Sequence, residues 1–154
     1  MLPPPIIFRP ARAEDLPAII AMLADDVLGR RREVVGPVPD ARYVAALRAI
    51  DADPNQFQAV AVLADEVVGT LQLTFLPGLA RTGAWRGQVE GVRVAAAQRG
   101  LGLGRLMVEW AVEQCRVRGC SLVQLTTDRQ RPDAHRFYES LGFVASHVGF
   151  KLPL

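Results

Sequence analysis

Three glycines stand at alternate positions directly before a segment with helical periodicity. They are Gly100, Gly102 and Gly104 in the stretch QRGLGLGRLMVEWAVEQCRVRG. Each glycine raises the entropic cost of ordering by about 0.5 to 1 kcal/mol relative to alanine, so we expect the bare backbone to be needed there. A helix start exposes unpaired N–H groups and carries about half a positive charge, which suits an anion. The stretch therefore predicts a phosphate-binding turn.

Two common phosphate-binding patterns do not fit this turn. A P-loop requires Lys followed by Ser or Thr, where this chain has Arg105 and Leu106. A dinucleotide-binding GxGxxG places its third glycine one residue later than Gly104, and the acidic residue that this pattern needs further on is missing. The pattern that remains is RxxGxG, formed by Arg99, Gly102 and Gly104.

A second segment completes a resemblance to a known family. RPDAHRFYESLGF, residues 131–143, ends in the pattern YExLGF from Tyr138 to Phe143. Together with RxxGxG between a strand and a helix, it resembles the GCN5-related N-acetyltransferase family over about residues 88–143. The resemblance implies a mixed α/β fold of about six to seven strands flanked by four helices. It also implies direct transfer of the acetyl group of acetyl-coenzyme A (acetyl-CoA) to a primary amine, without a metal.

The resemblance assigns cofactor contacts to the turn and to the strand before it. The pyrophosphate would lie on the backbone amides of the turn, with Arg99 and Arg105 adding charge, although Arg105 is equally explained as a solvated residue. The pantetheine arm would pair with the backbone of Val92 and Val94. The predicted cofactor-binding residues are Val92, Arg93, Val94, Arg99, Gly100, Leu101, Gly102, Leu103, Gly104, Arg105, Arg131, His135 and Tyr138.

Glu90 is the candidate general base. A free alkyl amine has a pKa of about 10.4, so its attack at neutral pH needs a base, directly or through water. Glu90 stands in the mostly apolar segment 88–94 and by period two shares a face with Val92 and Val94. A carboxylate in an apolar strand is costly unless it is used or paired, and an ion pair with Arg93 or with a nearby arginine is the alternative.

Tyr138 resembles the general acid of the family, a phenol that protonates the departing thiolate of coenzyme A. Its pKa of about 10 keeps the proton available at pH 7. Phe137, Tyr138 and Leu141 also fit the apolar stripe of a short helix, which would make Tyr138 a packing residue.

Arg131 departs from the family pattern, in which an asparagine commonly stands seven residues before the tyrosine. An arginine cannot accept the hydrogen bonds that an amide accepts. With Arg129 and Arg136 it forms a local basic patch, which could reach the 3′-phosphate of the cofactor or could simply be solvated. His135 lies on the same predicted helix, where a lone histidine is more often structural.

These residues must be positioned by one mixed α/β domain, which we predict over residues 1–154. Apolar patterns predict strands at 4–11, in a hairpin over 57–76 with its turn at 64–66, and at 88–94, 121–127 and 143–152. Helices are predicted at 14–29, at 40–51 with Asp40 as its cap, from the glycines to Gly119, and at 132–142. The third helix should bury Leu106, Met107, Trp110, Ala111, Gln114 and Val117.

Composition limits the classes of partner. The 154 residues are 50% hydrophobic and 22% charged with a net charge of +2, so a nucleic-acid-binding surface is not expected. No apolar run is long enough to cross a bilayer, and the N-terminal stretch is a poor signal peptide, so we expect a cytoplasmic protein without a membrane partner. Cys115 and Cys120 lack metal-site spacing and should be buried free thiols.

The acceptor and the oligomeric state stay open. Residues 30–33, three arginines and a glutamate in an irregular segment, could recognise an acidic acceptor or could be solvated. A homodimer through the last strand or a sheet edge is expected by analogy. Two alternatives to an enzyme remain, a non-catalytic acyl-CoA binding module and a turn that binds nothing.

Overall fold

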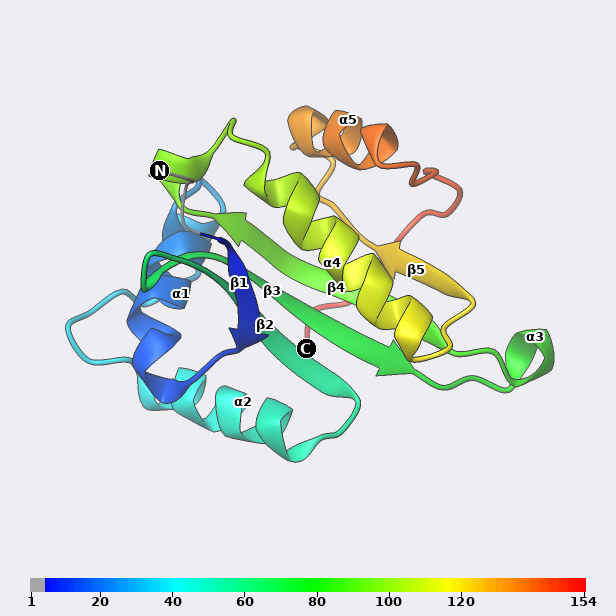
Figure 1. Cartoon of the computed structure of the whole chain (residues 1–154), viewed down its shortest axis with the longest axis horizontal. Coiled ribbons are helices and arrows are strands. Elements are labelled where there is room, and N and C mark those ends of the chain that lie inside the picture. The colour runs from blue at the N-terminus through cyan, green and yellow to red at the C-terminus, as the bar shows by residue number, and fades with distance from the viewer. Residues whose placement is uncertain (1–4) are drawn as a thin grey trace. The chain divides into compact units, whose positions relative to one another are not determined.

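A computed structural model describes residues 5–154 (Figure 1). The chain forms two compact units, Met1–Gln124 and Leu125–Leu154, and each is described by itself. Residues 1–4 include the first residue of the strand predicted at 4–11 and the start of the N-terminal stretch considered as a signal peptide. They lie outside the described residues.

Most of the predicted elements belong to the first unit, and the mixed α/β class is confirmed. The strands are β1 (Ile7–Pro10), β2 (Gln56–Leu63), β3 (Glu66–Leu76), β4 (Arg86–Val94) and β5 (Leu122–Leu125), of which β5 ends one residue into the second unit. The α-helices are α1 (Leu16–Ala24), α2 (Ala41–Ala52), the one-turn α3 (Ala80–Gly83) and α4 (Leu103–Val117), and the 3-10 turns are η1 (Ala13–Asp15), η2 (Gly29–Arg31) and η3 (Ala96–Gln98). The second unit carries α5 (Pro132–Ser140).

The strands form one sheet in the order β1-β2-β3-β4-β5. β1 pairs with β2, β2 with β3 and β3 with β4, each in the antiparallel direction. The β2–β3 hairpin turns through Ala64 and Asp65, whose φ angles of 47° and 67° are the left-handed values that a tight two-residue hairpin turn requires. The turn predicted at 64–66 is therefore confirmed.

Helix α4 covers one face of the sheet (Figure 1). A Cβ on Gly69 of β3 would lie 2.6 Å from the sulfur of Met107, and a Cβ on Gly87 of β4 would collide with Sγ of Cys115. Bare backbone at these two positions therefore lets the helix approach the strands closely.

The apolar stripe predicted for α4 is partly wrong. Met107 and Ala111 are buried, but Leu106 is 45% exposed and Val117 is 79% exposed. Leu103 and Cys115 take the missing places. The steps of four residues from Leu103 to Cys115 follow one face of the helix, and Leu106 lies outside that face.

The opposite face of the sheet packs against α1 and α2. Its apolar cluster consists of Ala11, Leu16, Ile19, Ile20, Leu47, Val60 and Val62. Asp40 caps α2 as predicted, since its carboxylate accepts the Arg42 N–H at 2.9 Å.

β4 contains a bulge that changes which side chains share a face. Gln72 of β3 lies opposite Glu90, and Thr70 of β3 lies opposite Arg93. The two pairs are two residues apart on β3 but three residues apart on β4, so β4 has one extra residue. Gly91, between them, has a φ of 59°. Because opposite residues share a face, Glu90 lies on the same face as Arg93. The prediction that Glu90 shares a face with Val94 is wrong, because the extra residue shifts the alternation of side chains along β4.

Residues 143–152 do not form the predicted last strand. They have no regular secondary structure, and their alternate apolar side chains Val144, Val148, Phe150 and Leu152 are exposed. The prediction of about six to seven strands is therefore wrong for the described residues, which form five. Alternation fits a segment to one face of a sheet, but a strand also needs a neighbouring strand for its N–H and C=O groups.

Candidate functional site

The turn between β4 and α4 has the backbone that its glycines suggest. Gly100 and Gly102 have φ angles of 77° and 84°, and Gly102 is the N-cap residue of α4. A Cβ on either residue would meet nothing within 4 Å. Glycine is therefore required here by the left-handed backbone and not by crowding. Gly104 lies in the first turn of α4 and has no such backbone.

The N–H groups of this turn are available to an anion. No backbone acceptor within residues 5–154 receives the N–H groups of residues 100–102, and the first N–H groups of α4 have no acceptor inside the helix. Leu103 anchors the turn with only 3% of its side chain exposed, whereas Leu101 is 72% exposed. With the helix dipole added, the turn is suited to an anion such as a phosphate.

Arg99 is held at the start of the turn by an aspartate. Its Nη2 lies 2.6 Å from Oδ2 of Asp25, just past the end of α1, and its Nε donates to the carbonyl of Val94 at 3.1 Å. Both members of the ion pair are about half exposed. The guanidinium that was predicted to contact phosphate thus lies at the start of the turn and is paired with a carboxylate.

Arg93 forms a similar ion pair with Asp26, the residue that follows the partner of Arg99. Its Nη2 lies 3.5 Å from Oδ2 of Asp26, and its Nη1 donates to the carbonyl of Val92 at 2.9 Å. Oδ1 of Asp26 accepts the N–H of Gly29 at 2.5 Å, at the start of η2. The end of α1 is therefore tied both to β4 and to the segment that carries the three arginines of residues 30–32.

β4 extends beyond its neighbour β5. The Ser121 N–H donates to the carbonyl of Trp85 at 2.8 Å, and Nε2 of Gln124 donates to Oε1 of Gln88 at 2.6 Å, three residues further along both strands. The two strands are therefore parallel. β3 lies on one side of residues 92–94, but on the side of β5 no strand among the described residues continues beside this segment, which is predicted to pair with the pantetheine arm.

Glu90 is exposed and lies on the sheet face of α1 and α2. The sequence analysis expected this carboxylate to lie in apolar surroundings. In the structure Glu90 lies next to the bulge at Gly91 and opposite the polar side chain of Gln72. The carboxylate therefore keeps its hydration and can be reached by an amine from solvent.

The sequence analysis missed a set of polar side chains around Glu90. Gln58 lies opposite Gln72, and Gln72 lies opposite Glu90, so the three form one row across β2, β3 and β4. A second row on the same face consists of Gln56, Thr74 and Gln88. The signal was present in the stretches QFQAV, TLQLT and QVE, where polar residues recur at every second position.

Arg105 lies in the first turn of α4 on the helix surface. Its Nη1 lies 3.5 Å from a carboxylate oxygen of Glu109, one helical turn further on, and both side chains are about half exposed. Such a pair leaves the guanidinium accessible to solvent.

The second unit holds Tyr138 within a small aromatic cluster. Its ring meets those of Phe137 and Phe143 edge-on, with centroids 5.1 and 5.9 Å apart. The carbonyl of Tyr138 accepts the Phe143 N–H at 3.1 Å, which closes the helix around Gly142 with its φ of 89°. These contacts fix the position of the ring.

The other predicted residues of the second unit lie on or next to α5. Arg131 is the N-cap residue and makes no side-chain capping hydrogen bond. Nε2 of His135 lies 3.1 Å from the carbonyl of Asp128, and Arg136 pairs with Asp133. The first unit thus brings together Glu90, β4 and the glycine turn, and the second unit brings together Arg131, His135 and Tyr138.

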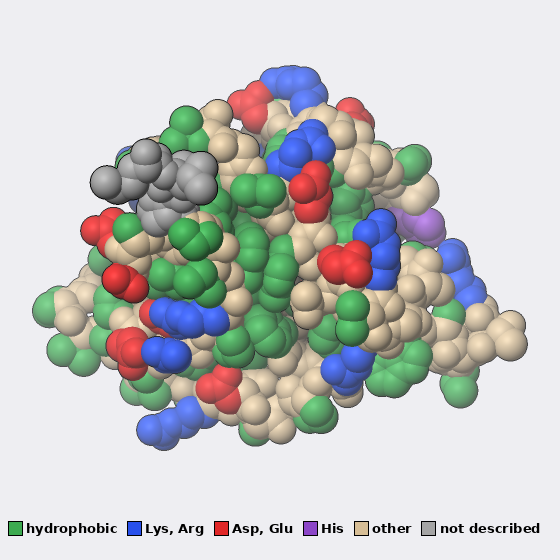
Figure 2. Space-filling model, in the orientation of Figure 1, with side chains coloured by type: hydrophobic (Ala, Val, Ile, Leu, Met, Phe, Trp, Pro, Cys, Tyr) green, Lys and Arg blue, Asp and Glu red, His purple; other side chains and the backbone are tan. Residues whose placement is uncertain are grey.

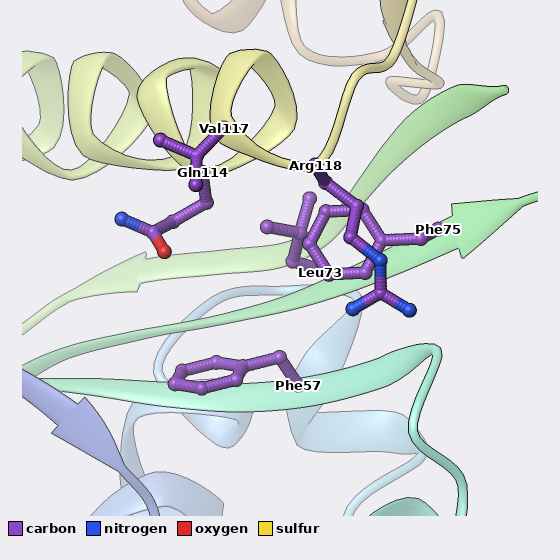
Figure 3. Close-up of a pocket in the computed structure, with 6 residues that line it drawn as sticks. All are labelled: Phe57, Leu73, Phe75, Gln114, Val117 and Arg118. Carbon is purple, nitrogen blue, oxygen red and sulfur yellow. The ribbon is translucent and has the colours of Figure 1, made fainter.

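A hollow of about 220 Å³ lies at the C-terminal end of α4 (Figure 3). It is lined by Phe57, Leu73, Phe75, Gln114, Val117 and Arg118. The Arg118 guanidinium covers part of it, 4.7 Å from the centre of the Phe75 ring. Because a helix of 15 residues is about 22 Å long, this hollow is remote from the glycine turn and does not belong to the predicted site.

The described part of the chain contains no group of three or more His, Cys, Asp and Glu side chains that could hold a metal ion. Within residues 5–154 no helix has both the length and the apolar character needed to cross a membrane. Arginine and carboxylate side chains are interspersed on the face that Figure 2 shows.

Comparison with curated proteins finds two named N-acetyltransferases. Aminoalkylphosphonate N-acetyltransferase of Salmonella typhimurium is 36% identical over 102 residues, which cover 66% of this chain and 66% of that protein. Glucosamine 6-phosphate N-acetyltransferase of Trypanosoma brucei brucei is 35% identical over 89 residues, which cover 57% of this chain and 58% of that protein. The matches span slightly less than two thirds of the length of these relatives.

A solved structure and a family model match over more of the chain. The crystal structure of a transcriptional regulator from Bacillus halodurans C-125 is 49% identical with a TM-score of 0.94, and the match covers 97% of this chain and 100% of that one. The model of the Acetyltransferase (GNAT) family matches residues 22–143, which include β4, the glycine turn, α4 and α5. The chain therefore belongs to the Acetyltransferase (GNAT) family.

Proposed function

We propose that the protein is an acetyl-CoA-dependent N-acetyltransferase that acts on a primary amine. The observation that carries this proposal is the turn before α4, whose N–H groups at residues 100–102 have no backbone acceptor in the described chain. Family membership supports the use of such a turn for coenzyme A. The family match extends through both compact units, which supports a single N-acetyltransferase domain over residues 1–154.

The coenzyme would be bound mainly through the backbone. The N–H groups of residues 100–104 would take the pyrophosphate, and Arg99 and Arg105 would add charge-assisted hydrogen bonds. Residues 92–94 would pair with the pantetheine arm in the manner of an added strand, with Arg93 supporting this segment through Asp26. We assign Arg131, His135 and Tyr138 to the same ligand from the second unit.

The reaction forms an N–C bond and breaks the C–S bond of the thioester. Glu90, directly or through a water molecule, takes a proton from the ammonium form of the acceptor, so that the freed nitrogen lone pair attacks the thioester carbon. The nitrogen loses its second proton to solvent as the tetrahedral intermediate collapses to the amide. The Tyr138 hydroxyl gives a proton to the sulfur as coenzyme A leaves. The exposure of Glu90 supports its role, because the acceptor must reach it from solvent.

We further propose that the acceptor is small and carries an anionic group. The names of both curated relatives specify an amine that also carries a phosphonate or a phosphate. In this chain, residues 30–32 are three exposed arginines whose side chains have no ion-pair partner among residues 5–154. They follow directly on Gly29, whose N–H is bound by Asp26, the partner of Arg93 on β4.

Thiol release from acetyl-CoA with a panel of primary amines tests the activity. The panel includes 2-aminoethylphosphonate, glucosamine 6-phosphate and neutral amines of similar size, and we expect saturable release that favours the anionic members. Tyr138→Phe, which removes only the hydroxyl, should lower turnover about 100-fold. Turnover within a factor of two of the parent would remove the general-acid role.

The second candidate function is acyl-CoA binding without transfer. The name of the Bacillus halodurans relative, a transcriptional regulator, favours it. It predicts a thermal shift with acetyl-CoA, about 2.7 kcal/mol of stabilisation at 100 times the dissociation constant, without thiol release from any amine. The absence of any shift would overturn both candidates.

We propose a cytoplasmic homodimer. Cys115 and Cys120 are free thiols, which suits a reducing compartment. The exposed alternate apolar residues of segment 143–152 are suited to pairing with a sheet edge of a second copy, where their backbone groups would find partners. Sedimentation at micromolar concentration tests the dimer, and a monomer under those conditions would refute it.

A further inference from the structure

The row formed by Gln58, Gln72 and Glu90 lies on one face of the sheet. It crosses β2, β3 and β4, which lie side by side in Figure 1. Neighbouring strands are about 4.8 Å apart, so the row is about 10 Å long from Gln58 to Glu90, which leaves room for a six-membered ring with hydrogen bonds at both ends. Half-buried amide groups on a sheet require an explanation, because amide groups are costly to remove from water without partners.

The hydrogen bonds of the two glutamines fix which atom of each amide faces outward. Nε2 of Gln58 donates to Oγ1 of Thr70 at 2.8 Å and to the carbonyl of Leu71 at 3.2 Å. Nε2 of Gln72 donates to Oε1 of Gln56 at 3.0 Å. The NH₂ group of each is therefore used within the sheet, and its oxygen has no hydrogen-bond partner among residues 5–154.

The second row differs in this respect. Oε1 of Gln56 also accepts the Thr74 hydroxyl at 2.8 Å, and Oε1 of Gln88 accepts Nε2 of Gln124 at 2.6 Å. Its carbonyl oxygens are thus used within the protein, and this row is explained by the structure of the sheet. The first row presents two amide oxygens and one carboxylate, all hydrogen-bond acceptors, on a face that includes the proposed base.

A line of acceptors selects a ligand with a line of donors. The amine supplies N–H groups to Glu90, and the two amide oxygens then require further donors on the same molecule. Hydroxyl groups next to the amine supply them, whereas a hydrocarbon leaves both oxygens without a partner and loses their hydration.

We propose that the acceptor is a hydroxylated primary amine of the amino-sugar or amino-polyol class, and that Gln58 and Gln72 determine this specificity. The inference rests on the proposed N-acetyltransferase function and names the chemical class of its acceptor. It assigns the two glutamines to substrate recognition and not to the chemical step.

The test compares two ring amines of similar size, glucosamine and cyclohexylamine, by thiol release from acetyl-CoA. We expect the parent to favour glucosamine by at least about tenfold in kcat/KM, the effect of one or two hydrogen bonds. Gln72→Met keeps the length of the side chain and removes the amide oxygen, so it should abolish most of this preference through the KM of glucosamine. The KM of acetyl-CoA should not change.

Gln88→Met is the matched control, because it removes an amide of the same face whose oxygen is already bound by Gln124. Its preference for glucosamine should stay within twofold of the parent. Equal rates for the two amines in the parent, or an unchanged preference in Gln72→Met, would overturn the inference and leave the proposed function intact. If no amine gave thiol release, the proposed function would be overturned. Calorimetry in the presence of coenzyme A would then test the inference by itself, since the parent should still bind glucosamine more tightly than cyclohexylamine.

Discussion

Replacing Gly102 by alanine separates the backbone strain of the glycine turn from its use by a ligand. The residue has a φ of 84° and a Cβ there would meet nothing within 4 Å. The substitution therefore introduces no collision with the protein itself. What it introduces is a non-glycine residue in the left-handed region and a methyl group next to the N–H groups of the turn.

The cost to stability follows from the backbone alone. A left-handed conformation costs an L-residue about 1 to 2 kcal/mol, which for a domain of this size is a decrease in Tm of about 2 to 8 °C. The cost to binding adds to this, because the methyl group lies where a phosphate would approach the N–H groups. We expect the affinity for coenzyme A to fall at least about tenfold, or about 1.4 kcal/mol, in calorimetry.

Gly119 provides the matched control at the other end of α4. Its φ is 80°, and a Cβ there would also meet nothing within 4 Å. Gly119→Ala should lower the Tm about as much as Gly102→Ala and leave the affinity for coenzyme A unchanged. If Gly102→Ala bound coenzyme A as tightly as Gly119→Ala does, the turn would not be the phosphate site. If it had the Tm of the parent, the argument from the backbone would be wrong.

Two further predictions concern titratable groups. Arg9 donates hydrogen bonds of 2.6 and 3.0 Å to Asp15 and so lowers the pKa of Asp15. The resulting stabilisation of the folded state is present above about pH 4, and it is lost as the pH falls through the lowered pKa. Asp15→Asn should cost about 1.5 to 3 kcal/mol in urea unfolding at pH 7, and a difference from the parent that did not shrink below pH 4 would contradict this. Burial raises the pKa of Cys115 to about 12, so maleimide at pH 8 should label Cys120 well before Cys115 in the folded protein; mass spectrometry of the labelled peptides checks the order.

Local signals in the sequence predicted most of the secondary structure. Asp40 before a helical pattern predicted the cap of α2, and the short polar stretch at residues 64–66 between two alternating runs predicted the hairpin. Each of these depends on interactions between residues close in the chain. The same holds for Gly100 and Gly102, where the residue type reports the backbone directly.

Features that depend on distant residues were not predictable in this way. The bulge at Gly91 depends on how β3 pairs with β4. It places Glu90 on the opposite face from Val94, whereas an alternation of period two places both on the same face. The ion pair between Arg99 and Asp25 joins residues 74 positions apart. Segment 143–152 has the pattern of a strand, but the pattern cannot say which edge, in which molecule, would receive it.

The space left by Gly69 beneath α4 has a consequence for the whole site. The Met107 sulfur occupies the volume that a side chain on β3 would need, one turn after the start of the helix. Because a short helix is stiff, a side chain at position 69 that displaced Met107 would also displace the N-terminal end of α4 and the glycine turn before it. The position of the glycine turn therefore depends on Gly69 of β3, a residue about 30 positions before the RxxGxG pattern.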